Sequence, residues 1–125
     1  MALAPGTLPL TLLASFMRAE GQTGAQEKPI DPSFKRVMVY LFVGTRGGQN
    51  RTRIVEMLKA EPSNPNRISE RLGLDYKTVQ HHLRLLEDNG VVVSSSKGTY
   101  GAIYFLTPYF EKYFDPVKAM WEGFG

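Results

Sequence analysis

The sequence predicts a mainly α-helical domain that contains one small β-hairpin, and three observations lead to this. Apolar residues recur at the spacing of a helix face in successive segments between residues 50 and 89. A glycine at position 73 separates a short helical segment from a longer one. Three valines at 91–93 then lead through a Ser- and Gly-containing turn into residues 99–106, as in a hairpin. The chain of 125 residues, 42% of them apolar, is long enough for one such domain with a single core.

The first 33 residues stand apart from this domain. Residues 8–17 are apolar but number only ten, whereas a membrane-spanning helix needs about 20. No Lys or Arg precedes them, so the charged start of a signal peptide is missing. We expect this segment to dock on protein or to contact a second subunit, in a cytoplasmic protein with no membrane role. Residues 18–33 are polar and predict a linker, so the ordered domain should span 34–106.

The segments before residue 61 predict one ambiguous element, one joint and one helix. Residues 35–43 fit either a strand or a helix. Residues 44–48 contain glycines but no following Gly-Lys-Ser/Thr, which excludes a Walker-type phosphate loop and favours a flexible joint. Residues 50–60 predict a helix with an apolar face and a basic flank. The face consists of Ile54, Met57 and Leu58, and the flank of Arg51, Arg53 and Lys59.

Two helices joined by a tight turn follow. Asn64, with a proline after it, predicts the cap of the first helix, and Gly73 predicts its end. Asp75 predicts the cap of the second helix, residues 76–89, and Gly90 supplies the left-handed residue that ends it. A short helix, a tight turn and a longer helix make a helix-turn-helix, whose second helix enters the major groove of DNA.

The second of these helices has one apolar and one basic face. On a helical wheel, Val79, Leu83 and Leu86 form the inward seam. His82 lies at the edge of the core, where we expect a half-buried ring held by a hydrogen bond. The outward side chains can donate hydrogen bonds, and they are Lys77, Thr78, Gln80, His81 and Arg84. An ordinary solvated face would mix acids with bases. Acids occur here only near the far end, so we expect this face to contact bases and phosphates.

The hairpin after this helix completes the outline of a winged helix-turn-helix. Its tip, residues 94–98, is polar and carries Lys97. Tyr100, in the return strand, is suited to lie along the sugar–phosphate edge. Arg67, near the free backbone N–H groups that begin the first helix, and Tyr76, at the edge of the second, complete the expected DNA contacts.

Residues 107–125 predict a last helical region that carries an aromatic stripe. A Thr-Pro pair begins it, and Pro116 should kink or split it at 115–116. The stripe consists of Phe110, Tyr113, Phe114, Val117 and Trp121. Part of it can cover the core, and we expect the remainder, with residues 8–17, to contact a second copy of the chain. A homodimer would present two recognition helices about 34 Å apart, which is one turn of DNA.

Charge and composition indicate an anionic partner and exclude several kinds of site. Eleven basic and six acidic residues give 35–106 a net charge of +5, while 1–34 and 107–125 each carry −1. A concentrated basic field favours a polyanion such as double-stranded DNA. The absence of cysteine excludes disulfides and thiolate metal sites, and His81 and His82 are adjacent on a helix, so they cannot share one ion. We therefore expect no metal and no cofactor. We also expect no enzymatic activity, since the sequence shows no catalytic triad, paired carboxylates or nucleotide loop.

Residues 75–92, with a close match at 72–79, resemble the recognition helix and first wing strand of ArsR-type winged helix-turn-helix regulators, especially archaeal ones. With the preceding helices the resemblance covers roughly 35–106, and it implies that 35–43 are helical. It also implies a DNA-binding homodimer in which the positions of Lys77, Thr78, Gln80 and His81 face the groove. Metal-sensing members use cysteine or histidine clusters that this chain lacks, so we expect no response to arsenic or zinc.

The predicted function is therefore that of a sequence-specific DNA-binding transcription regulator. The alternative is a winged helix that serves as a protein–protein adaptor in a transcription or replication assembly. An adaptor should expose apolar side chains on the outward face of the second helix, and Leu85 is the only apolar residue there.

Overall fold

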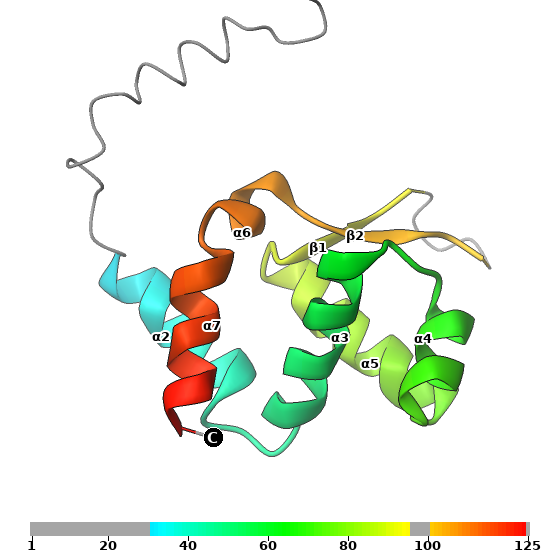
Figure 1. The fold of residues 1–125 in the computed structure, drawn as a ribbon, viewed down its shortest axis with the longest axis horizontal. Helices are drawn as coiled ribbons and strands as arrows, with labels where there is room; N and C mark the ends of the chain where they lie inside the picture. Colours follow the sequence, from blue (N-terminus) through cyan, green and yellow to red (C-terminus); the bar gives the residue numbers. More distant parts are fainter. Residues whose placement is uncertain (1–30, 96–100, 125) are drawn as a thin grey trace, which may run out of the picture. The chain divides into compact units, whose positions relative to one another are not determined.

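The computed structural model describes residues 31–95 and 101–124. The chain divides into two units, Met1–Asp31 and Pro32–Gly125, and the description below concerns the second unit alone. Its elements, in chain order, are α2 (Pro32–Phe42), α3 (Gly48–Ala60), α4 (Pro65–Leu72), α5 (Tyr76–Asp88), β1 (Val92–Ser94), β2 (Tyr104–Leu106), α6 (Pro108–Lys112) and α7 (Phe114–Phe124) (Figure 1). The expected apolar segment 8–17 and the expected wing contacts Lys97 and Tyr100 lie outside the described residues.

The unit begins with two helices, and the first of them contains the segment that could have been a strand or a helix. Residues 35–43 fall almost entirely within α2, so the helical alternative is confirmed. Helix α3 begins at Gly48, two residues before the expected start, with Gly47 at its N-cap. Met38, Leu41 and Phe42 are buried on the inner side of α2, which fixes this helix against the rest of the domain.

The helix-turn-helix has the caps that the sequence predicts. The side chain of Asn64 accepts a hydrogen bond from the backbone N–H of Arg67 at 2.8 Å, and Gly73 ends α4. The N-cap of α5 is Asp75. After α5, Gly90 has a φ of +75°, a conformation that only glycine adopts without strain. These caps fix where the recognition helix starts and stops.

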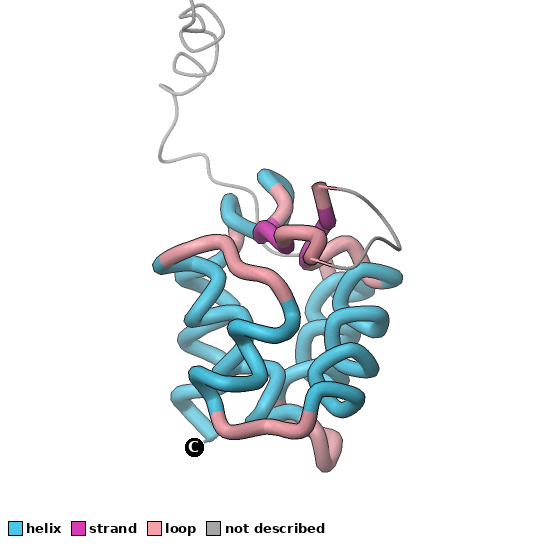
Figure 2. Tube along the Cα trace, turned by 90° about the vertical axis from the view of Figure 1, so that its right-hand side faces the viewer, coloured by secondary structure: helices cyan, strands magenta, loops and turns pink. Residues whose placement is uncertain are grey.

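The hairpin lies across one end of the long helices (Figure 2). Its strands are antiparallel, with Val92 opposite Leu106 and Ser94 opposite Tyr104. The expected second strand, 99–106, is shorter than predicted within its described part, because regular pairing covers only Tyr104–Leu106. The free edge of β2 is covered by Ser63, which exchanges two backbone hydrogen bonds with Tyr104, of 2.8 and 3.3 Å. The segment after α3 therefore ties the base of the wing to the helices.

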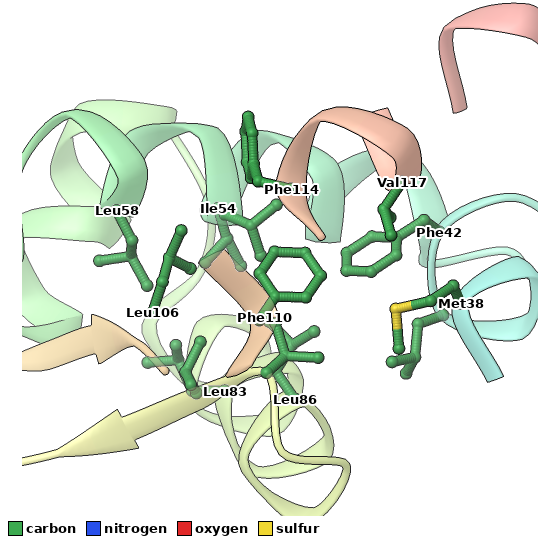
Figure 3. Packing of buried hydrophobic residues seen from close by; sticks show 14 of the residues in the cluster. Met38, Phe42, Ile54, Leu58, Leu83, Leu86, Leu106, Phe110, Phe114 and Val117 are labelled. Carbon is green, nitrogen blue, oxygen red and sulfur yellow. The ribbon is translucent and has the colours of Figure 1, made fainter. Parts of the chain in front are cut away.

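One core joins the helix-turn-helix to the C-terminal helices. Phe110, fully buried, lies among aliphatic side chains of α3 and α5 on one side and aromatic side chains of α2 and α7 on the other (Figure 3). The labelled residues around it are Ile54, Leu83, Leu86, Leu106, Phe42, Phe114 and Val117. Helices α6 and α7 thus complete the same core as α3 to α5, and the aromatic stripe supplies much of it.

The C-terminal region begins and divides at identifiable residues. The hydroxyl of Thr107 donates to the carbonyl of Gly90 at 2.7 Å and accepts from the backbone N–H of Phe110 at 3.0 Å. The helix divides at Tyr113, not at 115–116 as predicted. Pro116 is the third residue of α7, and in a first turn its missing N–H has no helical acceptor to lose.

Candidate nucleic-acid interface

The first turn of α5 is fixed by its cap. The carboxylate of Asp75 accepts hydrogen bonds from the backbone N–H groups of Lys77 at 3.0 Å and Thr78 at 3.3 Å. These N–H groups would otherwise lack helical partners. The side chains at the front of the helix therefore project from a defined backbone.

The two faces of α5 differ as the helical wheel predicts. Val79, Leu83 and Leu86 on the inward face are at most 1% exposed. The outward side chains are exposed at Lys77, Gln80, His81 and Arg84 and half-buried at Thr78. Within the part of the chain that the structure describes, none of these five side chains has a hydrogen bond or an ion pair. Their donors are therefore free to contact a ligand.

Two further predicted contact residues, Arg67 and Tyr76, are paired or half-buried. The guanidinium of Arg67 on α4 forms an exposed ion pair with Glu61, with an N–O distance of 3.3 Å. Tyr76 is half-buried. Burial raises the pKa of Tyr104 on β2, with further contributions from the nearby Glu87 and Tyr76. Tyr76 therefore lies near Tyr104 at the base of the hairpin and presents only part of its side chain to a ligand.

A buried guanidinium lies behind α5. Arg51 on α3 is only 3% exposed. Its Nε donates to the carbonyl of Leu41 at 2.7 Å, its Nη1 to Nδ1 of His82 at 3.0 Å, and its Nη2 to the hydroxyl of Thr45. Arg51 was predicted to belong to a basic flank of this helix, but it is buried, because the end of α2 and the middle of α5 cover it.

His82 is the part of this cluster that belongs to the recognition helix. The expected hydrogen bond is present, but the ring is more deeply buried than predicted, with 5% exposed. Burial, followed by the charge of Arg51 and the proximity of His81, lowers the pKa of His82 to about 4. The ring is therefore neutral near pH 7. Because a guanidinium can only donate, Nδ1 of His82 must accept, and the ring proton must reside on Nε2.

The glycine turn between α2 and α3, where the sequence predicts a flexible joint, is closely packed at two of its glycines. A Cβ atom on Gly47 would lie 2.5 Å from Nη1 of Arg51 and 2.7 Å from Cε1 of His82. A Cβ atom on Gly48 would lie 2.8 Å from the carbonyl oxygen of Phe42. The absence of side chains at these two positions lets the turn close over the Arg51–His82 pair.

The expected dimer stripe divides into buried and accessible parts. Phe110 and Val117 are fully buried and Phe114 is 6% exposed, so they cover the core of their own chain. Tyr113 and Trp121 are only partly buried against that core. Trp121 packs on the ring of Phe42, with centroids 5.0 Å apart.

Neither a metal-binding cluster nor a membrane-spanning helix occurs among the described residues. No group of three or more His, Asp, Glu or Cys side chains lies close enough together there to hold a metal ion. No helix in the described ranges has the length and apolar character needed to cross a membrane.

Sequence reasoning overlooked two side chains that line a hollow beside α5. Arg46 and Asn50, from the turn before α3 and its first helical turn, lie around this hollow with Lys77 and His81. Arg46 is exposed and Asn50 is half-buried. Their position depends on how closely the turn approaches α5, and the Gly47-Gly48 pair was the available signal of that close approach.

The comparisons with known proteins agree with this geometry. Residues 48–94, from α3 to the end of β1, match the family model described as bacterial regulatory protein, arsR family. That description is of a regulator and not of an enzyme, in line with the sequence prediction. No curated protein sequence matches the chain.

Solved structures of transcription regulators share the fold. HlyU from Vibrio vulnificus is 19% identical, with a TM-score of 0.50 over 88% of this chain and 92% of that chain. PcaV from Streptomyces coelicolor, solved with its natural ligand, is 18% identical, with a TM-score of 0.52 over 95% of this chain and 77% of that chain. At these identities the similarity concerns the fold, and it confirms the predicted winged helix-turn-helix.

Proposed function

We propose that this chain, a DNA-binding transcription regulator with a helix-turn-helix of the ArsR type, places α5 in the major groove of duplex DNA and the hairpin beside the backbone. The observation that carries this proposal is the outward face of α5, where exposed donors have no partner within the described residues. Gln80 and His81 suit base edges. Lys77 and Arg84 suit phosphates or the acceptors of guanine.

The remaining predicted contacts have supporting roles in this proposal. Arg67 is held by an exposed ion pair with Glu61, and such pairs are worth about 1 kcal/mol or less. A DNA phosphate would compete effectively with that carboxylate. Thr78 is suited to a backbone or base contact at the start of α5. Lys97 and Tyr100 remain proposed wing contacts, outside the described residues.

The test is a salt series of binding measurements with a charge-matched control. We expect Lys77→Ala/Arg84→Ala to lower affinity for a mixed-sequence duplex and to flatten the salt dependence by about two units, since each lost phosphate contact removes about one. Fluorescence anisotropy measures both quantities. The control, Arg71→Ala/Lys112→Ala, removes the same two charges from exposed positions on α4 and α6. Equal losses in the two variants would contradict a specific role for α5.

We further propose that the chain forms a homodimer through exposed aromatic side chains of its C-terminal helical region. Tyr109 is 53% exposed and packs edge-on against Phe34 and Tyr113, with ring centroids 5.5 Å apart in both cases. Exposed aromatic surface of this kind favours a protein contact. A symmetric dimer would set two α5 helices about 34 Å apart, matching half-sites one helical turn apart.

The dimer is tested by a charge on its accessible surface. Removal of residues 107–125 is unsuitable, because Phe110 and Val117 belong to the core and the rest of the chain would lose stability. We expect Tyr109→Glu to convert a dimer into a monomer in sedimentation velocity at micromolar concentration. Val93→Glu, at a 44% exposed position on the wing, serves as control and should leave the dimer intact. A wild-type monomer would end this proposal.

The adaptor alternative receives no support from the outward face of α5. Leu85, the one apolar residue that could mark an adaptor, is half-buried and packs against the core. We propose that the regulator acts in the cytoplasm. An archaeal relationship stays a prediction, since the matching family model is described as bacterial.

A further inference from the structure

An open hollow of about 480 Å³ lies between the turn before α3 and the first half of α5. Two elements far apart in the sequence supply its walls. The side chains that line it include Arg46, Asn50, Lys77, Thr78, His81 and His82. Arg51 completes the floor, and none of the lining residues is acidic. The hollow therefore combines positive charge with hydrogen-bond donors and contains no carboxylate to repel an anion.

One hydrogen-bond donor beside this hollow has no partner in the described part of the chain. His82 is 5% exposed, and Arg51 occupies its Nδ1 atom. The proton on Nε2 has no hydrogen-bond acceptor among the described residues, and the Nε2 atom itself is not fully shielded from solvent. The Cε1 edge of the ring, next to Nε2, faces the turn at Gly47. A neutral donor fixed in this way differs from the flexible surface lysines and arginines, because its direction is set by the core.

We propose that this hollow binds a phosphate group of the DNA backbone, with Arg46 and Lys77 supplying the charge and Nε2–H of His82 supplying a fixed hydrogen bond. The proposal rests on the proposed function and deepens it, because it adds a contact from outside the recognition helix. The amide of Asn50 supplies a further donor. Arg51 acts as a positioning residue, since its hydrogen bond to Nδ1 holds the ring proton on Nε2.

The location of the hollow favours backbone phosphate over other anions. Lys77, Thr78 and His81 both line it and belong to the outward face of α5. A helix in the major groove has a phosphate backbone on either side, so the anion beside these residues is a phosphodiester. Anchoring that phosphate from the α2–α3 turn would fix the angle at which α5 enters the groove.

The first test follows the two imidazoles by nitrogen NMR of the full chain. Before ligand is added, we expect Nε2 of His82 to be protonated and Nδ1 to accept. On adding a mixed-sequence duplex, we expect the resonances of both His81 and His82 to shift. A shift of His81 alone would overturn the proposal that the hollow binds a phosphate, but it would leave the proposed function intact. No shift of either ring would overturn the proposed function as well.

A second arm distinguishes DNA from free phosphate. Inorganic phosphate is added at an ionic strength matched to that of the duplex sample. We expect the Nε2 resonance of His82 to shift little with phosphate and strongly with the duplex. An equal, saturating shift with inorganic phosphate would overturn the assignment to the DNA backbone.

Variants at exposed positions test the site without unfolding the protein. We expect Arg46→Ala to weaken duplex binding about tenfold and to flatten the salt dependence by about one unit. Arg71→Ala removes the same charge from an exposed position that lines a different hollow, against α3, and should change both quantities much less. Equal losses of affinity in the two variants would overturn the role of Arg46. The NMR shift of His82 on adding duplex would then decide whether the hollow binds phosphate without Arg46.

Discussion

The regions on the two sides of helix α5 contain the same kinds of side chain, an arginine and a histidine, which are buried on one side and exposed on the other. Behind the helix, Arg51 and His82 are 3% and 5% exposed and bonded to each other. In front of it, Arg84 and His81 are exposed and have no side-chain hydrogen bond or ion pair within the described residues. Residue type alone therefore does not identify a DNA contact. The buried pair sets the position of the helix, and the exposed residues remain available to a ligand.

The difference follows from the cost of removing polar groups from water. A buried guanidinium is tolerated only when its N–H groups are satisfied, and Arg51 satisfies three of them with Leu41, Thr45 and His82. These partners come from the end of α2, the following turn and α5. One side chain thus connects three parts of the domain that are distant in sequence.

The largest expected effect concerns the buried pair. We expect Arg51→Leu to lower the free energy of unfolding by about 4 kcal/mol, because it leaves the carbonyl of Leu41 and Nδ1 of His82 without a donor. Urea unfolding measures this difference. Arg53→Ala, at an exposed position on the same helix, is the control and should cost less than about 1 kcal/mol. Similar losses in both variants would remove the distinction between the two regions.

The next largest effect is a pH dependence of stability that we expect from His82 and not from His81. The pKa of His82 falls from 6.5 to about 4 on folding, so the unfolded chain binds a proton in a range where the folded chain does not. Stability is full above pH 6.5 and decreases as the pH falls towards 4, by up to about 3 kcal/mol. Unfolding curves of His82→Gln should lose this component of the pH dependence. Those of His81→Gln should retain it, and the reverse result would contradict the assignment.

A smaller effect tests the cap that precedes the outward face. We expect Asp75→Ala to lower the free energy of unfolding by about 1 kcal/mol, because two backbone N–H groups lose their acceptor. Thermal unfolding followed by circular dichroism is sufficient. Asp88→Ala, at the other end of α5, removes the same charge without removing a cap. A larger loss from Asp88→Ala would show that charge matters more than capping.

The smallest expected effect on stability belongs to the outward face itself. We expect Arg84→Ala to change the free energy of unfolding by less than about 0.5 kcal/mol, since the side chain is exposed and has no hydrogen bond to lose. Its affinity for duplex DNA should nevertheless fall. A stability loss comparable to that of Arg51→Leu would mean that the front of α5 is structural.

Local signals in the sequence predicted most of the fold. The caps at Asn64 and Asp75 and the inward seam of α5 act within a few residues, so spacing reveals them. The environments of Arg51 and Gly47 depend on α2 and α5 approaching from elsewhere in the chain. The spacing of residues within α3 alone therefore assigned Arg51 to a basic flank, although it is buried. The pairing of Ser63 with β2 could not be predicted for the same reason, because it joins segments that are distant in the sequence.

The candidate site was predictable to a similar degree. The exposure of the α5 face follows from helical periodicity, which the sequence contains. The hollow beside it requires a turn and a helix to meet, and Arg46 gave no pattern of its own. The break near Pro116 was misplaced because proline was assumed to interrupt a helix, whereas here it lies in the first turn of α7.

The hydroxyl group of Thr107 helps to set how the end of α5 and the start of α6 lie relative to each other. Its hydroxyl bonds the carbonyl of Gly90, just beyond the recognition helix, and caps α6 through Phe110. Valine has nearly the same shape but can make neither hydroxyl bond, so Thr107→Val would leave only the backbone bond from residue 107 to the carbonyl of Val91 while the side-chain volume stays nearly unchanged. The end of α5 and the start of α6 are therefore joined at Thr107 by two hydrogen bonds, one from its hydroxyl to Gly90 and one from its backbone N–H to the carbonyl of Val91 at 2.9 Å, and a displacement of either helix end acts on the other through this residue.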